Sequence, residues 1–590
     1  SREGYIKKIL PLNEWVIVNG KINYFRNKYQ ITNPTYLSSM ENLDDVKTII
    51  PKYSLTEGLN EKTYRNIIEK VINQIPEINE WHDSKFIKKM NFFSWRESIK
   101  NLHNPNSKKD LNLIFLKRIA YDEIFANLLF LSGNRDKIKK IKKKVKNFRG
   151  FFSNQLIKSL PYKLTHGQKK IIDEINADLK SNLRMFRILQ GDVGSGKTII
   201  AKVVALNAIE AGYQCGLMAP TAILAEQHFK LLNELILHSN LKIKIELITG
   251  KIDAKKRKKI LDDLKNKKID FLVGTHALFQ KTISFNKLGL IIIDEQHKFG
   301  VKQRIKFAKK GGVDCDVLLM SATPIPRTMM MSIYGDMDTS RLEEKPKHRQ
   351  KILTLSKPEN KINELWPFLE KKIKNKEQIF WVCPLIEDSK KLDYSSTTRT
   401  FQIVSKKFPK KVGFIHGALD QLEKENVLKK FLNNEISVLV STTVIEVGVD
   451  FPNATVIIIE NSNKFGLAQL HQLRGRIGRG DKSGTCILLF KNQLSQNARK
   501  RIQILKSSDD GFYIAEEDMK LRGYGDLIGF KQSGMKLFKI ADPVHHEELF
   551  KLAEENIQTL NARELNNSKY EFLLKLFDKV DLVDEESVSS

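Results

Sequence analysis

Three patterns of apolar and polar positions follow one another along the 590-residue chain. From Val16 to Leu37, apolar and polar residues alternate around Asn-Gly and Asn-Pro breaks, which predicts short antiparallel strands of a small barrel. From Leu55 to Asn147, apolar residues recur at helical spacing, and the basic run KIKKIKKKVK lies at the end of this stretch. The first part of the chain is therefore expected to be a partial barrel followed by a helical connector.

The third pattern begins at Leu160, where strand-like apolar runs alternate with helical segments. It is interrupted after Leu342 by the polar stretch KPKHRQ and then resumes until Phe490. The strand-like runs are FRILQG, CGLMAP, IELITG, DFLVGTH, LIIIDE and VLLMSAT before the interruption, and QIFWVCPL, VGFIHG, VLVST, ATVIIIE and TCILLF after it. Apolar strands that alternate with helices predict a parallel sheet covered on both faces. The pattern therefore predicts two α/β domains in tandem.

These patterns divide the chain into six expected segments. They are a partial barrel over residues 1–45, a helical linker over 46–159, a first α/β domain over 160–345, a second over 346–495, a helical hairpin over 496–565 and a tail over 566–590. The end of the tail, from Val580, is acidic and polar, which is typical of a disordered segment.

Basic residues outnumber acidic ones: Lys and Arg total 100 against 69 Asp and Glu, a formal net charge of +31. Such an excess favours a polyanionic partner, nucleic acid before membrane, with salt-sensitive binding. A second interpretation stays open, because Lys, Asn and Ile are abundant throughout, as an AT-rich genome would produce, and scattered lysines are usually a solvated face. Charge is thus a supporting observation only.

The four cysteines, Cys215, Cys315, Cys383 and Cys486, lie far apart in apolar stretches and form no CxxC pair. They are expected to pack as small hydrophobic residues rather than to bind zinc or form disulfides. No apolar run is long enough to span a bilayer, and the start of the chain lacks a signal-peptide core. We expect a soluble cytoplasmic protein without a membrane partner. The first residue is Ser rather than Met, which is typical of a processed or incomplete chain.

The run FRILQ leads into the loop GDVGSGKT and then into the helical TIIAKVVALNAI. A strand, a glycine-rich loop and a helix in this order predict phosphate binding, since backbone N–H groups close around phosphate oxygens at the positive end of a helix. The expected phosphate cradle includes Gly191, Gly194 and Gly196. Lys197 is expected to reach the terminal phosphates of ATP, and Thr198 to ligate Mg²⁺.

A second part of the ATP site is expected where the strand-like LGLIII ends in Asp-Glu-Gln-His. Asp294 is placed to hold Mg²⁺, and Glu295 to orient or deprotonate the attacking water. Without the glycine loop, an Asp-Glu pair after a strand would more simply be interpreted as solvent-exposed residues at the edge of the sheet. His297 is expected to link the nucleotide to the inter-domain cleft, with a structural histidine as the alternative. Gln168 is a candidate for reading adenine, with a surface glutamine as the alternative.

The second α/β domain carries an arginine cluster in QLRGRIGRG. Arg476 and Arg479 have the spacing QxxGRxxR, with Arg474 just before them. Guanidinium groups of this kind stabilise the charge of a transferred phosphoryl group, and their place on another domain would make hydrolysis depend on domain closure. An arginine-rich helix that binds nucleic acid directly is the competing interpretation.

The order of these motifs resembles helicase superfamily two, and their details resemble the RecG family of bacterial helicases. The matching stretches are LPYKLTHGQ, LQGDVGSGKT, MAPTAILAEQH, VGTHALFQ, IIDEQHKFGVKQR, SATPIPRT, STTVIEVGVDFPNAT and QLHQLRGRIGRG. The nearest related family, the transcription-repair coupling factors, usually has a second Glu and then Gln where this sequence has DEQH. The resemblance implies two RecA-like domains, which use ATP and Mg²⁺.

The resemblance also implies contacts with one strand of nucleic acid and coupling to hydrolysis, in loops that would otherwise be unremarkable. The loop residues implied are Pro220, Thr221, Gly274, Thr275 and His276 in the first domain, Thr323 in the Ser-Ala-Thr run, and Thr442, Thr443 and 446–450 in the second domain. Small hydroxyl groups and N–H groups at loop tips position phosphates without reading sequence.

The segment from Glu516 to Gly534, EEDMKLRGYGDLIGFKQSG, is similar to the translocation motif that both families place in a helical hairpin. The matching residues are Arg522, Gly523, Gly525, Gly529, Gln532, Ser533 and Gly534. By resemblance, Arg522 and Gln532 bond across the hairpin and transmit closure of the motor to duplex DNA. Tyr524 and Phe530 depart from the family pattern. A plain glycine-rich connector is the alternative.

Upstream, VIVNGKINYFRNKYQITNP resembles the last strands of the RecG wedge, a barrel of the oligonucleotide-binding (OB) type, without the beginning of that barrel. The resemblance implies an ATP-driven 3′–5′ translocase on duplex DNA that remodels stalled forks and Holliday junctions in repair and recombination. It implies a monomer in the bacterial nucleoid, with branched duplex DNA as partner and a single-strand DNA-binding protein as a further candidate. A transcription-repair coupling translocase and a non-catalytic branched-DNA binder are the alternatives.

Overall fold

The structure is a computed structural model in which the chain forms two compact units. The first unit contains residues 1–127, 538–559 and 566–590, and the second contains 128–537 and 560–565. The residues that the structure describes are 13–25, 28–32, 34, 36–40, 51–105, 109–139, 142–250, 252–275, 278, 280, 282–294, 312–322, 324–326, 329–331, 335, 337–346, 350–384, 390–417, 419–442, 451–478, 482–491, 494–522, 538–560 and 568–579. Each unit is considered by itself below.

The first unit begins with two antiparallel strand pairs, which confirms the strands predicted between Val16 and Leu37. The pairs are β1 (Val16–Asn19) with β4 (Tyr36–Ser39), and β2 (Asn23–Phe25) with β3 (Lys28–Gln30). The helices that follow are α3 (Glu61–Asn73), α4 (Ser84–Met90), α5 (Trp95–His103) and, up to Asn127, the first part of α6 (Lys109–Lys139), joined by α21 (Glu547–Gln558) and α23 (Glu571–Leu576) from the end of the chain. These small strands are consistent with part of an OB-type barrel.

Residues from the end of the chain complete the helical part of the first unit. The Glu123 carboxylate accepts hydrogen bonds from the backbone N–H groups of Ile540 and Ala541, and Asn556 donates one to the Tyr121 hydroxyl at 2.7 Å. Because both Glu123 and Tyr121 are buried, these bonds satisfy polar groups that water cannot reach.

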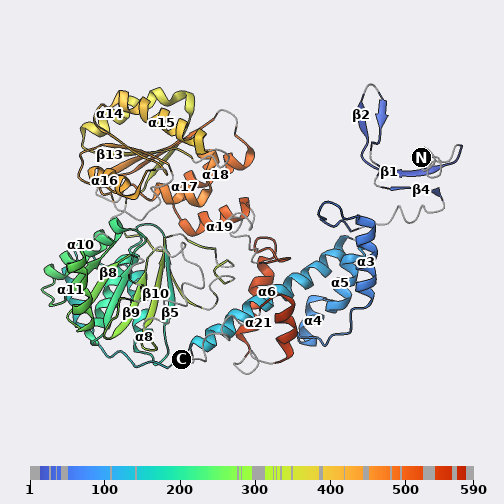
Figure 1. Cartoon of the computed structure of the whole chain (residues 1–590), viewed down its shortest axis with the longest axis horizontal. Helices are drawn as coiled ribbons and strands as arrows, with labels where there is room; N and C mark the ends of the chain where they lie inside the picture. Colours follow the sequence, from blue (N-terminus) through green and yellow to red (C-terminus); the bar gives the residue numbers. More distant parts are fainter. Residues whose placement is uncertain are drawn as a thin grey trace. The chain divides into compact units, whose positions relative to one another are not determined.

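The first sheet of the second unit has seven strands in the order β11-β5-β10-β9-β6-β8-β7, and all neighbouring strands are parallel (Figure 1). The strands are β5 (Phe186–Gly191), β6 (Gln214–Met218), β7 (Ile245–Ile248), β8 (Phe271–Gly274), β9 (Leu288–Ile293), β10 (Asp316–Ser321) and β11 (Asp338–Leu342). The helices are α7 (Phe151–Ser159), α8 (His166–Lys180), α9 (Lys197–Glu210), α10 (Ala222–His238) and α11 (Ala254–Lys265). Leu290 and Ile292 lie in one apolar core cluster and Ile291 and Ile293 in another, so both faces of the sheet are covered.

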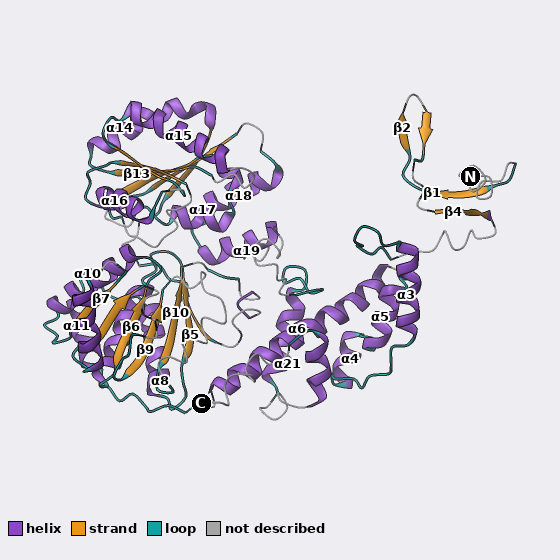
Figure 2. Ribbon diagram, viewed as in Figure 1, coloured by secondary structure: helices purple, strands orange, loops and turns teal. Residues whose placement is uncertain are grey.

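The second sheet has six strands in the order β12-β17-β16-β13-β15-β14, again all parallel (Figure 2). The strands are β12 (Leu353–Pro358), β13 (Gln378–Val382), β14 (Val412–Ile415), β15 (Val438–Ser441), β16 (Ala454–Ile459) and β17 (Thr485–Phe490). The helical elements are η4 (Glu359–Leu365), α14 (Trp366–Lys374), α15 (Lys390–Lys407), α16 (Gln421–Leu432), η6 (Ser462–Lys464), α17 (Leu467–Arg474), α18 (Gln496–Ser507) and α19 (Gly511–Arg522). The prediction of two tandem parallel-sheet domains of the RecA type is confirmed.

The basic run at the end of the connector includes two buried lysines, although lysine side chains are usually exposed. Helix α6 ends at Lys139, and Lys143 and Lys146 are not on a solvated face but are buried. Their ammonium groups lie 2.6 and 2.8 Å from the carboxylate of Asp316, which is itself buried at the start of β10. A buried carboxylate needs cationic partners, and this need overrides the usual exposure of lysine.

All four cysteines are free and buried, as expected for small apolar side chains. Burial raises the pKa of each thiol, to about 12 for Cys315 and Cys486. Within the described ranges, no helix is both long and apolar enough to cross a membrane.

Candidate ATP site and its inter-domain contacts

The loop GDVGSGKT joins the carboxyl end of β5 to the first turn of α9, as predicted. Gly194 and Gly196 have φ angles of +77° and +93°, a region that favours glycine. A Cβ on Gly196 would lie 2.3 Å from the side-chain amide nitrogen of Gln168, so a larger residue does not fit there. The loop therefore has the backbone form that a phosphate cradle requires.

Lys197 and Gln168 both bind the backbone of this loop. The Lys197 ammonium donates to the carbonyl oxygens of Gly191 and Asp192, each at 2.8 Å. The Gln168 amide donates to the Ser195 carbonyl at 2.9 Å, while its oxygen accepts from the Thr165 N–H at 3.0 Å and completes the cap of α8. Gln168 is buried rather than a surface glutamine, and its amide supports the loop; the adenine role stays a prediction.

Asp294 follows the end of β9, two strands from β5 in the sheet, and is almost fully buried. Because the carboxyl ends of parallel strands meet at one edge, Asp294 and the glycine loop lie on the same edge of the sheet. His228 of α10 lies with its Nε2 atom 3.0 Å from an Asp294 carboxylate oxygen, a contact that orients the carboxylate. Thr198 lies in the first turn of α9. The predicted residues Glu295 and His297 lie outside the described residues.

In the second domain, the arginine cluster lies at the end of α17. The first two N–H groups of this helix, at Leu467 and Ala468, donate to the buried carboxylate of Asp518 in α19 at 3.0 and 3.1 Å. At the other end of α17, Arg474 is buried and donates to the Ser508 carbonyl at 2.9 Å. Helix α19 and the corner before it therefore hold α17 at both ends.

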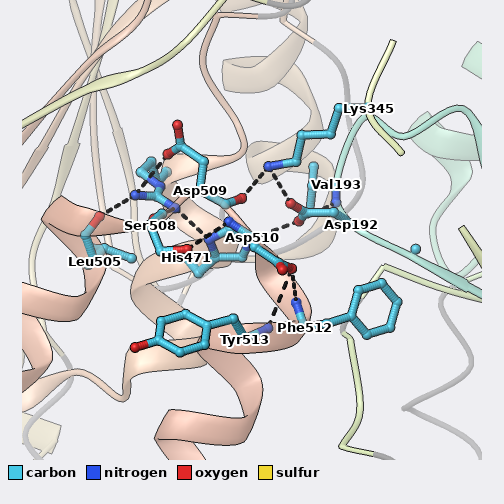
Figure 3. Close-up of polar contacts among 12 residues, drawn as sticks. Asp192, Val193, Lys345, His471, Leu505, Ser508, Asp509, Asp510, Phe512 and Tyr513 are labelled. Atoms are coloured by element: carbon cyan, nitrogen blue, oxygen red, sulfur yellow. Dashed lines mark hydrogen bonds and ion pairs between the residues drawn. The ribbon is translucent and has the colours of Figure 1, made fainter. Parts of the chain in front are cut away.

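The end of α17 contacts the glycine loop of the first domain (Figure 3). The Nε2 atom of His471 lies 2.8 Å from one carboxylate oxygen of Asp192, and the Lys345 ammonium lies 2.7 Å from the other. Burial alone raises the pKa of Asp192, but these two cationic or proton-donating partners outweigh burial and hold the pKa well below its ordinary value. The glycine loop is thus in direct polar contact with the second domain.

Arg476, two residues after Arg474, is buried next to this contact, whereas Arg479 lies outside the described residues. A Cβ on Gly475 would lie 2.9 Å from the Cβ of Val193, so the backbone that leads into Arg476 packs directly on the glycine loop. The structure therefore brings together the loop and the arginine-bearing turn; their joint role in an ATP site stays a prediction.

Those predicted nucleic-acid contacts that the structure describes lie at the ends of strands or in the loops that follow them. Thr221 caps α10, Thr275 follows β8, and Thr442 follows β15 with its N–H bonded to the Ile415 carbonyl. Pro220 precedes Thr221, and Gly274 ends β8. Several predicted residues fall outside the described residues, or have only their backbone described: His276, Thr323, Thr443, 446–450, the side chain of Arg522, and Gln532.

Several residues of this arrangement had no predicted role. They are Asp192, His228, Lys345, His471, Gly511 and Asp518. Asp192, His228 and His471 lie inside the motif stretches quoted above, but their motifs do not show which side chains meet across a domain boundary. Only the fold brings Asp192 and His471, 279 positions apart, into contact.

Three family models match the chain in the order of the fold. A DEAD/DEAH box helicase model matches residues 165–332, a helicase conserved C-terminal domain model matches 360–481, and a model for the C-terminal part of domain 3 of the ATP-dependent DNA helicase RecG matches 508–580. The first range includes β5 to β10 of the first sheet, the second includes β13 to β16 of the second sheet, and the third includes α19 and the helices at the end of the chain.

Curated relatives extend this likeness over nearly the whole chain. The ATP-dependent DNA helicase RecG of Bacillus subtilis (strain 168) is 40% identical over 95% of this chain and 81% of its own length, and that of Thermotoga maritima is 39% identical over 95% and 71%. A solved structure of RecG bound to a three-way DNA junction aligns with a TM-score of 0.70 and 36% identity over 93% of this chain and 72% of that one. By these matches the chain belongs to the RecG family of ATP-dependent DNA helicases.

Proposed function

We propose that this protein hydrolyses ATP with Mg²⁺ to move along duplex DNA and remodel branched DNA, including stalled replication forks and Holliday junctions. One observation carries the proposal: the phosphate-binding loop of one RecA-like domain touches the arginine-bearing turn of the other. Such a shared site makes hydrolysis depend on domain closure, which is the requirement for a motor. The relatives above do not favour a transcription-repair coupling translocase or a non-catalytic binder.

In the proposed reaction, the glycine loop and Lys197 bind the phosphates, and Arg476 and Arg479 stabilise charge on the transferred phosphoryl group. Thr198 and Asp294 offer hydroxyl and carboxylate oxygens, the donor types that Mg²⁺ prefers, beside the phosphate loop. The metal would supply charge neutralisation at the phosphates. Glu295 would orient the attacking water, and Gln168 and His297 remain candidates for adenine binding and for coupling to the cleft.

The proposed route from hydrolysis to movement runs through α17 and α19. Because Asp518 holds the start of α17 and the Ser508 carbonyl holds its end, a shift of α17 carries α19 with it. Helix α19 ends at Arg522, inside the segment that resembles the translocation motif, where Arg522 and Gln532 would pass the shift to DNA. The loops with Pro220, Thr221, Thr275, His276, Thr323, Thr442 and Thr443 would grip the backbone and let the motor advance with 3′–5′ polarity.

The partial wedge has chemistry suited to a branch point. On the described strands β2 and β3, Tyr24, Phe25 and Tyr29 are each more than half exposed, and Tyr24 and Tyr29 pack against each other with ring centroids 5.0 Å apart. Exposed aromatic rings can stack on unpaired bases without reading their sequence. We further propose that the protein acts as a monomer in the bacterial nucleoid and that a single-strand DNA-binding protein is a partner.

The direct test is ATP hydrolysis in the presence of a model fork, a linear duplex or a single strand of equal nucleotide content. Branched-DNA remodelling predicts the strongest stimulation by the fork and a fall in stimulation as salt rises, since phosphate contacts release counterions. Equal stimulation by the fork and the linear duplex would show that the wedge confers no preference. No stimulation by any DNA would overturn the proposed function.

The coupling step has its own prediction. Arg522→Ala should leave DNA-stimulated ATP hydrolysis within about threefold of wild type while fork regression falls by about tenfold or more, because one charged hydrogen bond in the transmission path is lost. Regression is measured on a labelled fork in a gel assay. Arg499→Ala on α18 provides a matched control for loss of charge. Equal loss of hydrolysis and regression would instead indicate a structural role for Arg522.

A further inference from the structure

A closed ring of polar contacts joins the phosphate-binding loop to the second domain. This polar ring consists of Asp192, Lys345, His471, Arg474 and Asp509. From Asp192, one branch runs through His471 to Arg474, whose Nη2 atom lies 2.8 Å from His471 Nδ1. Arg474 reaches the Asp509 carboxylate at 3.2 Å, and Lys345 binds both the Asp509 carbonyl and the Asp192 carboxylate, which closes the ring (Figure 3).

The hydrogen positions on His471 follow from its two partners. A guanidinium group can only donate, so the Nδ1 atom that faces Arg474 must accept. The Nε2 atom then carries the hydrogen and donates it to Asp192. Each ring nitrogen of His471 therefore has one role: Nδ1 accepts from Arg474 in the same helix, and Nε2 donates to Asp192 in the first domain.

Beside the polar ring, two glycines allow backbone segments of the two domains to pack closely. A Cβ on Gly511, the first residue of α19, would lie 2.9 Å from His471 Nε2 and 3.0 Å from the Asp192 Cγ atom. One helical turn after His471, Gly475 packs against Val193. Adjacent residues of the loop, Asp192 and Val193, thus meet adjacent turns of α17, which fixes both the position and the rotation of the helix that leads to Arg476.

The chemistry of Asp192 argues against direct binding of phosphate. A carboxylate repels phosphate oxygens, and the low pKa of Asp192 keeps it ionised at neutral pH. Its side chain instead contacts Lys345 and His471, and one of its oxygens accepts the N–H of Val193 at 2.7 Å. The second residue of the phosphate loop is therefore turned toward the partner domain.

We propose that Asp192 and His471 are positioning residues for ATP hydrolysis: they seat α17 on the phosphate-binding loop and thereby place Arg476 at the transferred phosphoryl group. This inference rests on the proposed function, because it assigns Arg476 its role there. It predicts that breaking the contact lowers kcat for hydrolysis and leaves ATP affinity nearly unchanged, since the glycine loop and Lys197 still bind the phosphates.

Two substitutions separate the two contacts of His471. The amide of Gln reaches the position of Nε2 and can donate to Asp192, whereas the shorter Asn reaches the position of Nδ1 and can only accept from Arg474. We expect His471→Asn to lower kcat by about 10- to 100-fold and His471→Gln to stay within about threefold of wild type. Asp192→Asn, which keeps the bond to Val193 but loses the charge, should also lower kcat. A fluorescent ATP analogue should bind all three variants with wild-type affinity within about threefold.

The readout is ATP hydrolysis by the full chain without DNA, with His238→Asn at the exposed end of α10 as matched control. In an Arg476→Ala background, His471→Asn should change kcat by less than about twofold, because both substitutions remove the same interaction. An additive further loss, equal effects of Asn and Gln, or wild-type kcat in His471→Asn would each overturn the inference. A wild-type protein that hydrolyses ATP but does not respond to DNA would contradict the proposed function and leave this test valid.

Discussion

The two sheets of the second unit are wound in the same order, yet the loops that follow their first strands differ. Counted from its own first strand, each sheet runs first, sixth, fifth, second, fourth and third, and the first sheet adds β11 beside β5. Strand β5 lies between β10 and β11 and leads into the glycine loop, whereas its counterpart β12 is an edge strand that leads into η4, ENKINEL. The fold is shared; the loop after the first strand decides the chemistry.

The fifth strand of each sheet, β9 or β16, is followed by a carboxylate, and the two carboxylates have different surroundings. Asp294 follows β9 and meets His228 of the helix between the second and third strands. At the equivalent place, Glu460 follows β16, is bonded to Trp381 at 2.7 Å, and meets Thr400 of the equivalent helix. Burial raises the pKa of Glu460, despite these donors. One sheet has at this position the carboxylate that is proposed to bind Mg²⁺, and the other has a carboxylate held by Trp381 and Thr400.

The largest expected effect on ATP hydrolysis comes from a comparison of lysines in or after the first strands of the two sheets, β5 and β12. Lys197→Ala should lower ATP hydrolysis by about 100- to 1000-fold, because it removes a cation that stabilises phosphate charge in the transition state. The matched substitution in the other sheet, Lys357→Ala on β12, should leave hydrolysis unchanged, since Lys357 pairs only with the exposed Glu364 among the contacts described for it. Hydrolysis assays of the two purified variants test this contrast; comparable losses would break it.

The carboxylates give the next contrast. Asp294→Asn should lower hydrolysis by about 100-fold, with a weakened dependence on Mg²⁺ concentration, because the charge that holds the metal is lost. Glu460→Gln should leave hydrolysis within about twofold of wild type. ATP hydrolysis measured over a range of Mg²⁺ concentrations distinguishes the two variants. A changed Mg²⁺ dependence in Glu460→Gln would contradict the assignment of Mg²⁺ binding to Asp294 and not to Glu460.

A smaller effect is expected for the pair of helices α17 and α19 in the second domain. Asp518→Ala should destabilise that domain by about 2 to 4 kcal/mol, because two N–H groups at the start of α17 lose their buried acceptor. Thermal unfolding followed by circular dichroism measures the loss. Asp518→Asn, which keeps one acceptor oxygen, should recover part of it; no difference between Ala and Asn would argue against the capping role.

The smallest effect is on stability in the first domain, where α9 is buried along nearly its whole length. Burial lowers the pKa of Lys202 on this helix from 10.5 to about 8. Between these values the unfolded chain keeps a proton that the folded protein has lost, so stability should rise with pH from about 8 to 10.5. Lys202→Met should raise stability at pH 7 by about 1 to 3 kcal/mol and flatten this rise. Denaturant unfolding at pH 7 and pH 10 tests it; an unchanged pH slope would contradict the argument.

Eleven of the thirteen strands in the two sheets coincide with apolar runs in the sequence, because buried parallel strands must be apolar on both faces. The two that the sequence did not reveal, β11 and β12, are edge strands, where one side of each strand is free of neighbours and polar residues are tolerated. Sequence pattern thus predicts the interior of a sheet better than its borders.

The site shows a similar limit. Glycines, Lys197 and Asp294 could be predicted because loop chemistry depends on local order along the chain. Asp192–His471 and Asp518–Leu467 could not, because each joins residues that are close only after two domains or two helices have packed. The same holds for Lys143 and Lys146, whose burial depends on Asp316, about 170 positions away. Local motifs predict the candidate reacting groups, and tertiary packing brings the residues that contact them into place.

The burial of all four native thiols makes the protein well suited to measurements of domain closure. Thiols that are enclosed and hold their protons react slowly with maleimides, because the thiolate is the reactive form. A cysteine introduced on an exposed position of each RecA-like domain would therefore take a fluorophore selectively, without removal of the native ones. Energy transfer between two such dyes would then report each cycle of closing and opening as it happens on a single molecule.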